Sequence, residues 1–182
     1  MSVSDPRSDQ ELIAAANAGD AAAFAAIYER YRDWAVRLAY RFTGSRDDAL
    51  EVMQDAFLYL LRKFPGFRLS ARLTTFLYPV IRNLALSRRR KKAPASVADD
   101  ALLLLPAAEP DHAASTKADL AAVLAVLPDA QREVLLMRFV DGMALAEIAE
   151  ALEIPVGTVK SRVHHALRTL RDDERTKRYF AP

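Results

Sequence analysis

Apolar side chains recur at spacings of three and four residues along most of this chain, and this period is typical of helices packed against a core. Glycine, which weakens helices, occurs only 5 times in 182 residues. No segment shows the alternation of a strand. The sequence therefore predicts an all-α protein, with helices over residues 9–18, 21–43, 45–63, 71–90, 118–127, 128–140, 144–152 and 157–171.

Residues 93–117 interrupt this pattern. They are rich in alanine, proline and aspartate and contain three prolines, a composition that favours a linker. The chain is therefore expected to form two helical domains, residues 9–92 and residues 118–174, joined by a flexible linker. Residues 1–8 are expected to be frayed, and Asp20 and Ser45 to cap the helices that follow them.

The composition excludes several classes of protein. Cysteine is absent, which rules out disulfides, cysteine-based zinc sites and cysteine nucleophiles, and which fits a reducing cytoplasm. The N-terminus lacks the basic start and apolar run of a signal peptide. The longest apolar runs, such as residues 101–108, are too short to span a bilayer. We expect a cytoplasmic protein without membrane insertion.

The positive charge is concentrated in two places. Residues 62–92 contain ten basic residues and no acidic one, and residues 156–182 contain seven basic and three acidic residues. Acidic stretches separate the two, and each basic stretch follows an apolar helical pattern. A charge run can be a solvated face, but this distribution favours two separate surfaces that bind a polyanion.

Residues 144–171 have the spacing of a helix-turn-helix. Leu145, Ile148 and Leu152 are expected to form the buried stripe of the first helix, and Thr158 is expected to cap the second. On the second helix the side opposite the apolar residues carries donors and no acid, which suits a helix lying in a major groove. The alternative is an ordinary amphipathic helix with a basic exterior. The outward residues are Lys160, Ser161, His164, His165 and Arg168.

A metal site is not expected. His164 and His165 are adjacent on a helix and point about 100° apart, so they cannot clamp one ion. His112 lies in the linker. No cofactor is predicted.

Two tracts resemble a known family. LPDAQREVLLMRFVDGMALAEIAEALEIPVGTVKSRVHHALRTLR (127–171) resembles region 4 of the extracytoplasmic-function sigma factors of bacterial RNA polymerase, in the sigma-70 family. GDAAAFAAIYERYRDWAVRLAYRFTGSRDDALEVMQDAFLYLLRKF (19–64), followed by LTTFLYPVIRNLALSRRRK (73–91), resembles region 2. GTVKSR alone is shared with other helix-turn-helix regulators, but the two tracts together, in this order, are highly specific.

The resemblance implies a division of labour. Region 2 would bind the clamp helices of core RNA polymerase and capture the opened −10 element. Region 4 would bind the flap tip and read the −35 duplex, and an anti-sigma factor is an expected partner. The implied polymerase-binding residues are Gln54, Asp55, Phe57, Leu58 and Leu61. The implied −10 residues are Lys63, Phe67, Arg68, Arg72, Asn83, Arg88, Arg89 and Arg90. The implied −35 residues are Thr158, Lys160, Ser161, Arg162, His164, His165 and Arg168.

The residues themselves fit DNA melting. Unpaired bases are held by aromatic or amide side chains while cations hold the phosphates, and aromatic residues are interleaved with basic ones between positions 63 and 82. The aromatic residues could instead belong to the core. We expect burial for Phe64 and Phe76 and exposure for Phe67, which lies in a loop. Asn83 could equally be an interior amide.

Several positions depart from the family pattern. Pro79 lies inside a predicted helix, where it removes the hydrogen bond to Thr75 and should kink the helix. Phe76 replaces the usual tryptophan, and Ser87 and Arg88 replace a more typical acid and leucine. Glu153 replaces a glycine, which implies strain if the turn needs a positive φ.

Two other functions compete with this interpretation. A self-sufficient helix-turn-helix regulator would dimerise through its N-terminal half and prefer a two-fold symmetric site, but the basic block of residues 62–92 has no use in a dimerisation domain. An enzyme acting on nucleic acid needs clustered carboxylates with a metal, or an activated nucleophile. The paired acids at 47–48, 99–100 and 172–173 lie at a helix start, in the linker and at a helix end. No catalytic activity is expected.

Overall fold

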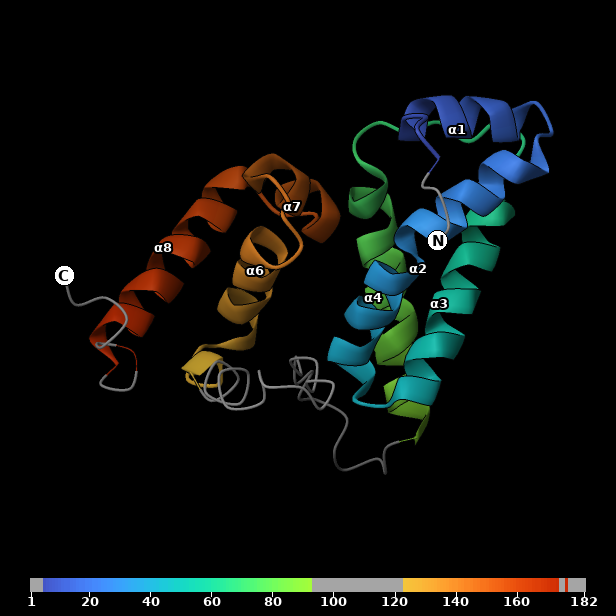
Figure 1. Ribbon diagram of the computed structural model, residues 1–182. Coiled ribbons are helices and arrows are strands. Elements are labelled where there is room, and N and C mark those ends of the chain that lie inside the picture. The colour runs from blue at the N-terminus through green and yellow to red at the C-terminus, as the bar shows by residue number, and fades with distance from the viewer. Residues whose placement is uncertain (1–4, 93–122, 174–175, 177–182) are drawn as a thin grey trace. The chain divides into compact units, whose positions relative to one another are not determined.

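The structure, a computed structural model, describes residues 5–92, 123–173 and 176, and all regular elements in these residues are helices (Figure 1). The chain divides into two compact units, residues 1–99 and 100–182. The predicted all-α fold is confirmed, whereas the predicted linker 93–117 and most of the predicted helix 118–127 lie outside the described residues. The first unit contains α1 (Asp9–Asn17), α2 (Ala21–Thr43), α3 (Arg46–Leu61) and α4 (Leu73–Lys92). The second contains α6 (Asp129–Phe139), α7 (Leu145–Leu152) and α8 (Val156–Asp172).

Short polar side chains begin the helices of the first unit. Asp20 Oδ1 accepts hydrogen bonds from the backbone N–H groups of Ala22 (2.9 Å) and Ala23 (3.2 Å), and Ser45 accepts from Asp48. Both predicted caps are confirmed. The expectation of a frayed start is wrong for residues 5–8, because Ser8 and Glu11 form a reciprocal capping box that begins α1.

Helix α2 is the centre of the first unit and contacts α1, α3 and α4. Its apolar stripe is buried against the stripes of these helices, with Ile27 and Leu38 fully inaccessible and Phe42 set edge-on to Tyr78 of α4. Each such side chain contributes about 1.5–3 kcal/mol by leaving water. The three- and four-residue spacing thus places one core between α2 and its neighbours, and the opposite faces remain available to partners.

Pro79 lies within α4, which continues through it to Lys92. Because proline has no N–H, the carbonyl of Thr75 loses its helical partner. The Oγ1 atom of Thr75 is also buried without a hydrogen-bond partner.

In the described part of the second unit, α8 contacts both α6 and α7. The core of this part contains Met137, Met143, Ile148, Val159 and Ala166. The buried Arg132 side chain donates to the carbonyls of Leu124 (2.9 Å) and Leu127 (2.8 Å), and so closes the turn that precedes α6. This packing leaves one long side of α8 uncovered.

In the described parts of the chain, every helix is too short or too polar to cross a bilayer.

Candidate functional site

The uncovered side of α8 carries the predicted polar residues. Lys160, Ser161, His164, His165 and Arg168 are exposed, whereas Arg162 and Thr158 are half-buried. Val159, Ala166 and Leu170 are buried on the opposite side, as the helical wheel predicts. Among these residues the outward face holds hydrogen-bond donors and cations without an acid, a combination complementary to phosphates and to the acceptors on base edges.

A tight turn sets the position of α8. Helix α7 ends at Leu152, Glu153 takes a left-handed conformation (φ 54°, ψ 42°), and the N–H of Ile154 donates to the carbonyl of Ala149 (3.0 Å). The positive φ at Glu153 meets the condition under which the sequence implies strain there. The predicted cap at Thr158 is wrong, because α8 begins at Val156 after Pro155, and Thr158 lies in its first turn.

The strain at Glu153 gives a testable effect on stability. Replacing Glu153 by glycine is expected to raise the free energy of unfolding by about 0.5–1 kcal/mol, because a Cβ atom is costly at positive φ. Urea unfolding of the full chain measures it. Glu153→Ala keeps the Cβ atom and serves as the control. Equal stabilisation by both substitutions would show that the carboxylate, and not the backbone, is responsible.

The basic block of the first unit forms part of the loop after α3 and the outer side of α4. Lys63, Arg68 and Arg72 of the loop are exposed, as are Asn83 and Arg90 of α4, and Arg89 is half-buried. The exposure of Asn83 excludes the interior-amide interpretation. These side chains place hydrogen-bond donors and positive charge at the surface of the unit.

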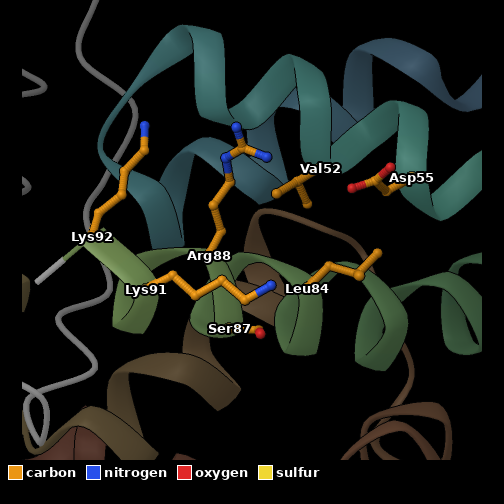
Figure 2. Close-up of a pocket in the computed structure, with 7 residues that line it drawn as sticks. All are labelled: Val52, Asp55, Leu84, Ser87, Arg88, Lys91 and Lys92. Carbon is orange, nitrogen blue, oxygen red and sulfur yellow. The ribbon is translucent and has the colours of Figure 1, made fainter.

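Arg88 of α4 is bound by acidic residues of α3. Its Nε donates to Asp48 (2.7 Å), its Nη2 to Glu51, and Lys92 Nζ also donates to Asp48 (2.6 Å). Figure 2 shows Arg88 and Lys92 reaching from α4 toward α3, beside a hollow of about 300 Å³ that Val52, Asp55 and Ser87 also line. The sequence predicts that Arg88 contacts DNA, but in this structure its guanidinium is already paired with acidic side chains of the same unit.

The pair of cations holds the pKa of Asp48 below its usual range, chiefly through the hydrogen bond from Lys92 and then that from Arg88. The carboxylate is stabilised in the folded state, so its contribution is complete above the ordinary carboxyl pKa of about 4 and is lost as the pH falls through the lower folded value. Asp48→Asn is expected to lower the free energy of unfolding by about 1–2 kcal/mol at pH 7.

This difference should shrink as the pH falls from about 5 to about 3. Denaturant unfolding at several pH values measures it, with Asp47→Asn as the control, since Asp47 is the exposed neighbour in the same first turn. A difference that is independent of pH would contradict the ion-pair interpretation.

A chain of aromatic contacts anchors the loop between α3 and α4. The ring of Phe67 lies 5.5 Å from that of Phe64 and 4.8 Å from that of Phe76, while Phe64 contacts Phe24 (5.8 Å) and Phe76 stacks on Tyr59 (6.3 Å). The expected exposure of Phe67 is wrong, because this cluster leaves only 8% of the residue exposed to solvent. The two rings expected in the core, Phe64 and Phe76, are half-buried.

Asn17 also holds this loop, and sequence reasoning missed it. Its side chain makes three hydrogen bonds with the backbone of Gly66 and Phe67. These residues lie about fifty positions further along the chain, and a lone asparagine at a helix end carries no signal of so distant a contact.

An apolar hollow of about 350 Å³ opens between α2 and α3, lined by Phe24, Tyr28, Gln54, Phe57, Leu58 and Leu61. Phe57 is buried against Tyr28 (5.0 Å), whereas the side chains of Leu58 and Leu61 are 49% and 46% exposed. Exposed leucines beside an apolar hollow are typical of a protein-binding surface. Asp55, predicted with this set, lies on the other flank of α3.

Both units match known regions of one protein family. The Sigma-70 region 2 model matches residues 27–94 and the Sigma-70 region 4 model matches residues 117–170. The ECF RNA polymerase sigma factor SigW of Bacillus subtilis is 34% identical over 167 residues, which cover 84% of this chain and 89% of SigW. SigM of Mycobacterium tuberculosis is 34% identical over 162 residues, 88% of this chain and 81% of SigM.

A solved structure shares the fold. The sigma factor RpoE of Bartonella quintana, in complex with the anti-sigma factor NepR, superposes with a TM-score of 0.64 at 22% identity, covering 82% of this chain and 94% of RpoE. Two family matches in the expected order, and relatives 34% identical over more than four fifths of both chains, lead to one conclusion: the chain belongs to the extracytoplasmic-function sigma factors of RNA polymerase.

Proposed function

We propose that this sigma factor directs core RNA polymerase to promoters through three surfaces, one for the −35 duplex, one for the opened −10 strand and one for polymerase. Two observations together carry the proposal. Each of the two separately packed units has a cationic surface, and the first unit also has an apolar hollow with exposed leucines. A single DNA-binding surface would suffice for an ordinary regulator. Binding to polymerase and to two DNA elements supplies the free energy that holds the DNA open, and no catalytic group is required.

The second unit would read the −35 element as a duplex. Helix α8 has the dimensions to enter a major groove, and its outward face offers donors from Lys160, Ser161, His164, His165 and Arg168. The exposed cations Lys160 and Arg168 would also contact the phosphate backbone, together with the half-buried Arg162 and Thr158 near the start of the helix.

The first unit would hold the −10 element as a single strand. Unpaired bases bind where aromatic rings and amides lie among cations. The loop offers the half-buried ring of Phe64 among exposed cations, and α4 offers the exposed amide of Asn83, whereas the buried Phe67 would support the loop. Arg89 and Arg90 would contact phosphates. Arg88 would do so in competition with Asp48 and Glu51.

The hollow between α2 and α3 would receive the clamp helices of core polymerase, with Leu58 and Leu61 as its exposed apolar contacts. Residues 93–117 would thread toward the RNA exit path, and the second unit would bind the flap tip. Because the related RpoE forms a complex with an anti-sigma factor, we expect a protein of this kind to cover the same surfaces here. The site of action would be the cytoplasm, where polymerase and promoter DNA are found.

A gel-shift comparison tests the proposal. The purified chain alone is expected to bind promoter DNA weakly, because in this proposal polymerase sets the distance between the two DNA-binding units. Addition of core polymerase should produce a tight, sequence-specific complex. Tight binding of a symmetric site by the chain alone would support a self-sufficient regulator instead.

A further inference from the structure

Asn17, the last residue of α1, joins that helix to the loop after α3. Its Oδ1 accepts hydrogen bonds from the N–H groups of Gly66 (2.7 Å) and Phe67 (3.0 Å), and its Nδ2 donates to the carbonyl of Phe67 (2.8 Å). In Figure 1 this loop passes beside α1 at one end of the first unit. One side chain thus satisfies three backbone groups of a segment without regular structure.

The chemistry of these contacts favours an amide over other side chains. A carbonyl oxygen has two lone pairs and can accept from both N–H groups, while the amide nitrogen supplies the donor for the carbonyl. Aspartate would place a second oxygen against the Phe67 carbonyl, and alanine would leave all three backbone groups without their partner. Turning the amide over would set its donors against two N–H groups.

The anchor of Asn17 is itself well held. Helix α1 begins with the Ser8–Glu11 capping box and buries Leu12 and Ile13 in the core. Arg30 of α2 donates to Asp9 (2.7 Å) and to the backbone carbonyls of Asp5 and Arg7. Asn17 therefore ties the loop to a helix that is fixed at both its apolar and its polar side.

The contact defines where the loop presents its outward residues. Phe67 is fixed twice, through its backbone by Asn17 and through its ring by Phe64 and Phe76. The next residues turn outward at once, since Arg68 and Ser70 are exposed, and so is Arg72 at the end of the loop. Asn17 itself is half-buried, at the surface of the unit and not within its core.

We propose that Asn17 is a positioning residue for −10 recognition, which holds the loop of residues 66–72 in the conformation that receives an unpaired base. This inference rests on the proposed function of the loop. Asn17 touches no base itself and acts through the backbone of Gly66 and Phe67. Its loss should therefore weaken the preference for one base at the −10 position that the loop binds, while the other promoter contacts are unchanged.

The experiment uses the full chain with core polymerase and DNA carrying an unpaired −10 segment, with each −10 position changed in turn to the four bases. Asn17→Ala is expected to reduce the preference for the favoured base at one position about tenfold, and to change the preferences at the others less than about twofold. Gln10→Ala removes an exposed amide from the same helix and is the control. 2-Aminopurine at the affected position should report weaker capture of the base.

Asn17→Asp keeps the acceptor for the two N–H groups but loses the donor. Its base preference at the affected position should lie between those of wild type and Asn17→Ala. It also serves as the test if the alanine variant folds poorly. Unchanged base preferences at every position, or a uniform loss at all of them, would overturn the positioning role. If the wild-type complex itself shows no base preference in the −10 segment, the proposed function fails. If the wild type is selective and the Asn17 variants are equally selective, only the positioning role fails.

Discussion

Replacing Lys160 and Arg168 together by glutamine is expected to weaken binding of the polymerase complex to a −35 duplex about thirtyfold at 0.15 M salt. Each lost phosphate contact makes the negative slope of log affinity against log salt shallower by about 0.9, so the loss of two contacts makes it shallower by about 1.8. Both side chains are exposed on α8, and their loss should leave the free energy of unfolding unchanged. Fluorescence anisotropy from 0.05 to 0.3 M salt gives the affinity and the slope.

The matched control removes the same charge from another part of the surface. Arg37→Gln with Arg46→Gln takes away two exposed cations from α2 and α3, outside the proposed DNA contacts. Equal losses for the two double variants would mean that net charge, and not the face of α8, attracts the duplex. Any additional loss confined to one base pair would identify a direct base contact, which is worth about 1–3 kcal/mol of discrimination.

Replacing Leu58 by glutamate is expected to reduce the affinity for core polymerase at least thirtyfold, in the absence of DNA. A charge placed in the buried centre of an interface costs about 2 kcal/mol or more. Because the Leu58 side chain is 49% exposed in the free chain, the substitution should not unfold the protein. A pull-down titration with core polymerase measures the loss, and circular dichroism establishes that the helices persist.

Tyr59→Glu is the control for this experiment. Tyr59 is the next residue of α3 and is similarly exposed at 40%, but its ring stacks on Phe76 and so faces α4 and not the hollow. Binding of polymerase by this variant should stay within about twofold of wild type. A strong effect of Tyr59→Glu with none of Leu58→Glu would place the polymerase surface on the other flank of α3.

The sequence predicted the helices well because their signals are local. The apolar spacing of α2, the Asp20 and Ser45 caps and the glycine at position 44 act within a few residues of one another. The outward face of α8 followed from the same geometry, since a helix with one apolar side has only one way to pack. The strain at Glu153 was also predictable, because a helix-turn-helix leaves the residue in its turn little choice of φ.

Contacts between distant segments could not be predicted in this way. The pairing of Arg88 with Asp48 depends on how α4 lies against α3, which no local pattern specifies. The burial of Phe67 depends on three rings from different elements, so its position in a loop was misleading. The Ser8–Glu11 capping box, in contrast, had a readable signature and could have been found.

The most direct test of the central claim is selection from random DNA. The full chain, with and without core polymerase, is mixed with a random duplex pool, and the bound DNA is sequenced. A sigma factor of this design is expected to enrich two separate elements at a constant spacing, and only when polymerase is present. Enrichment of a single two-fold symmetric site by the chain alone would contradict it.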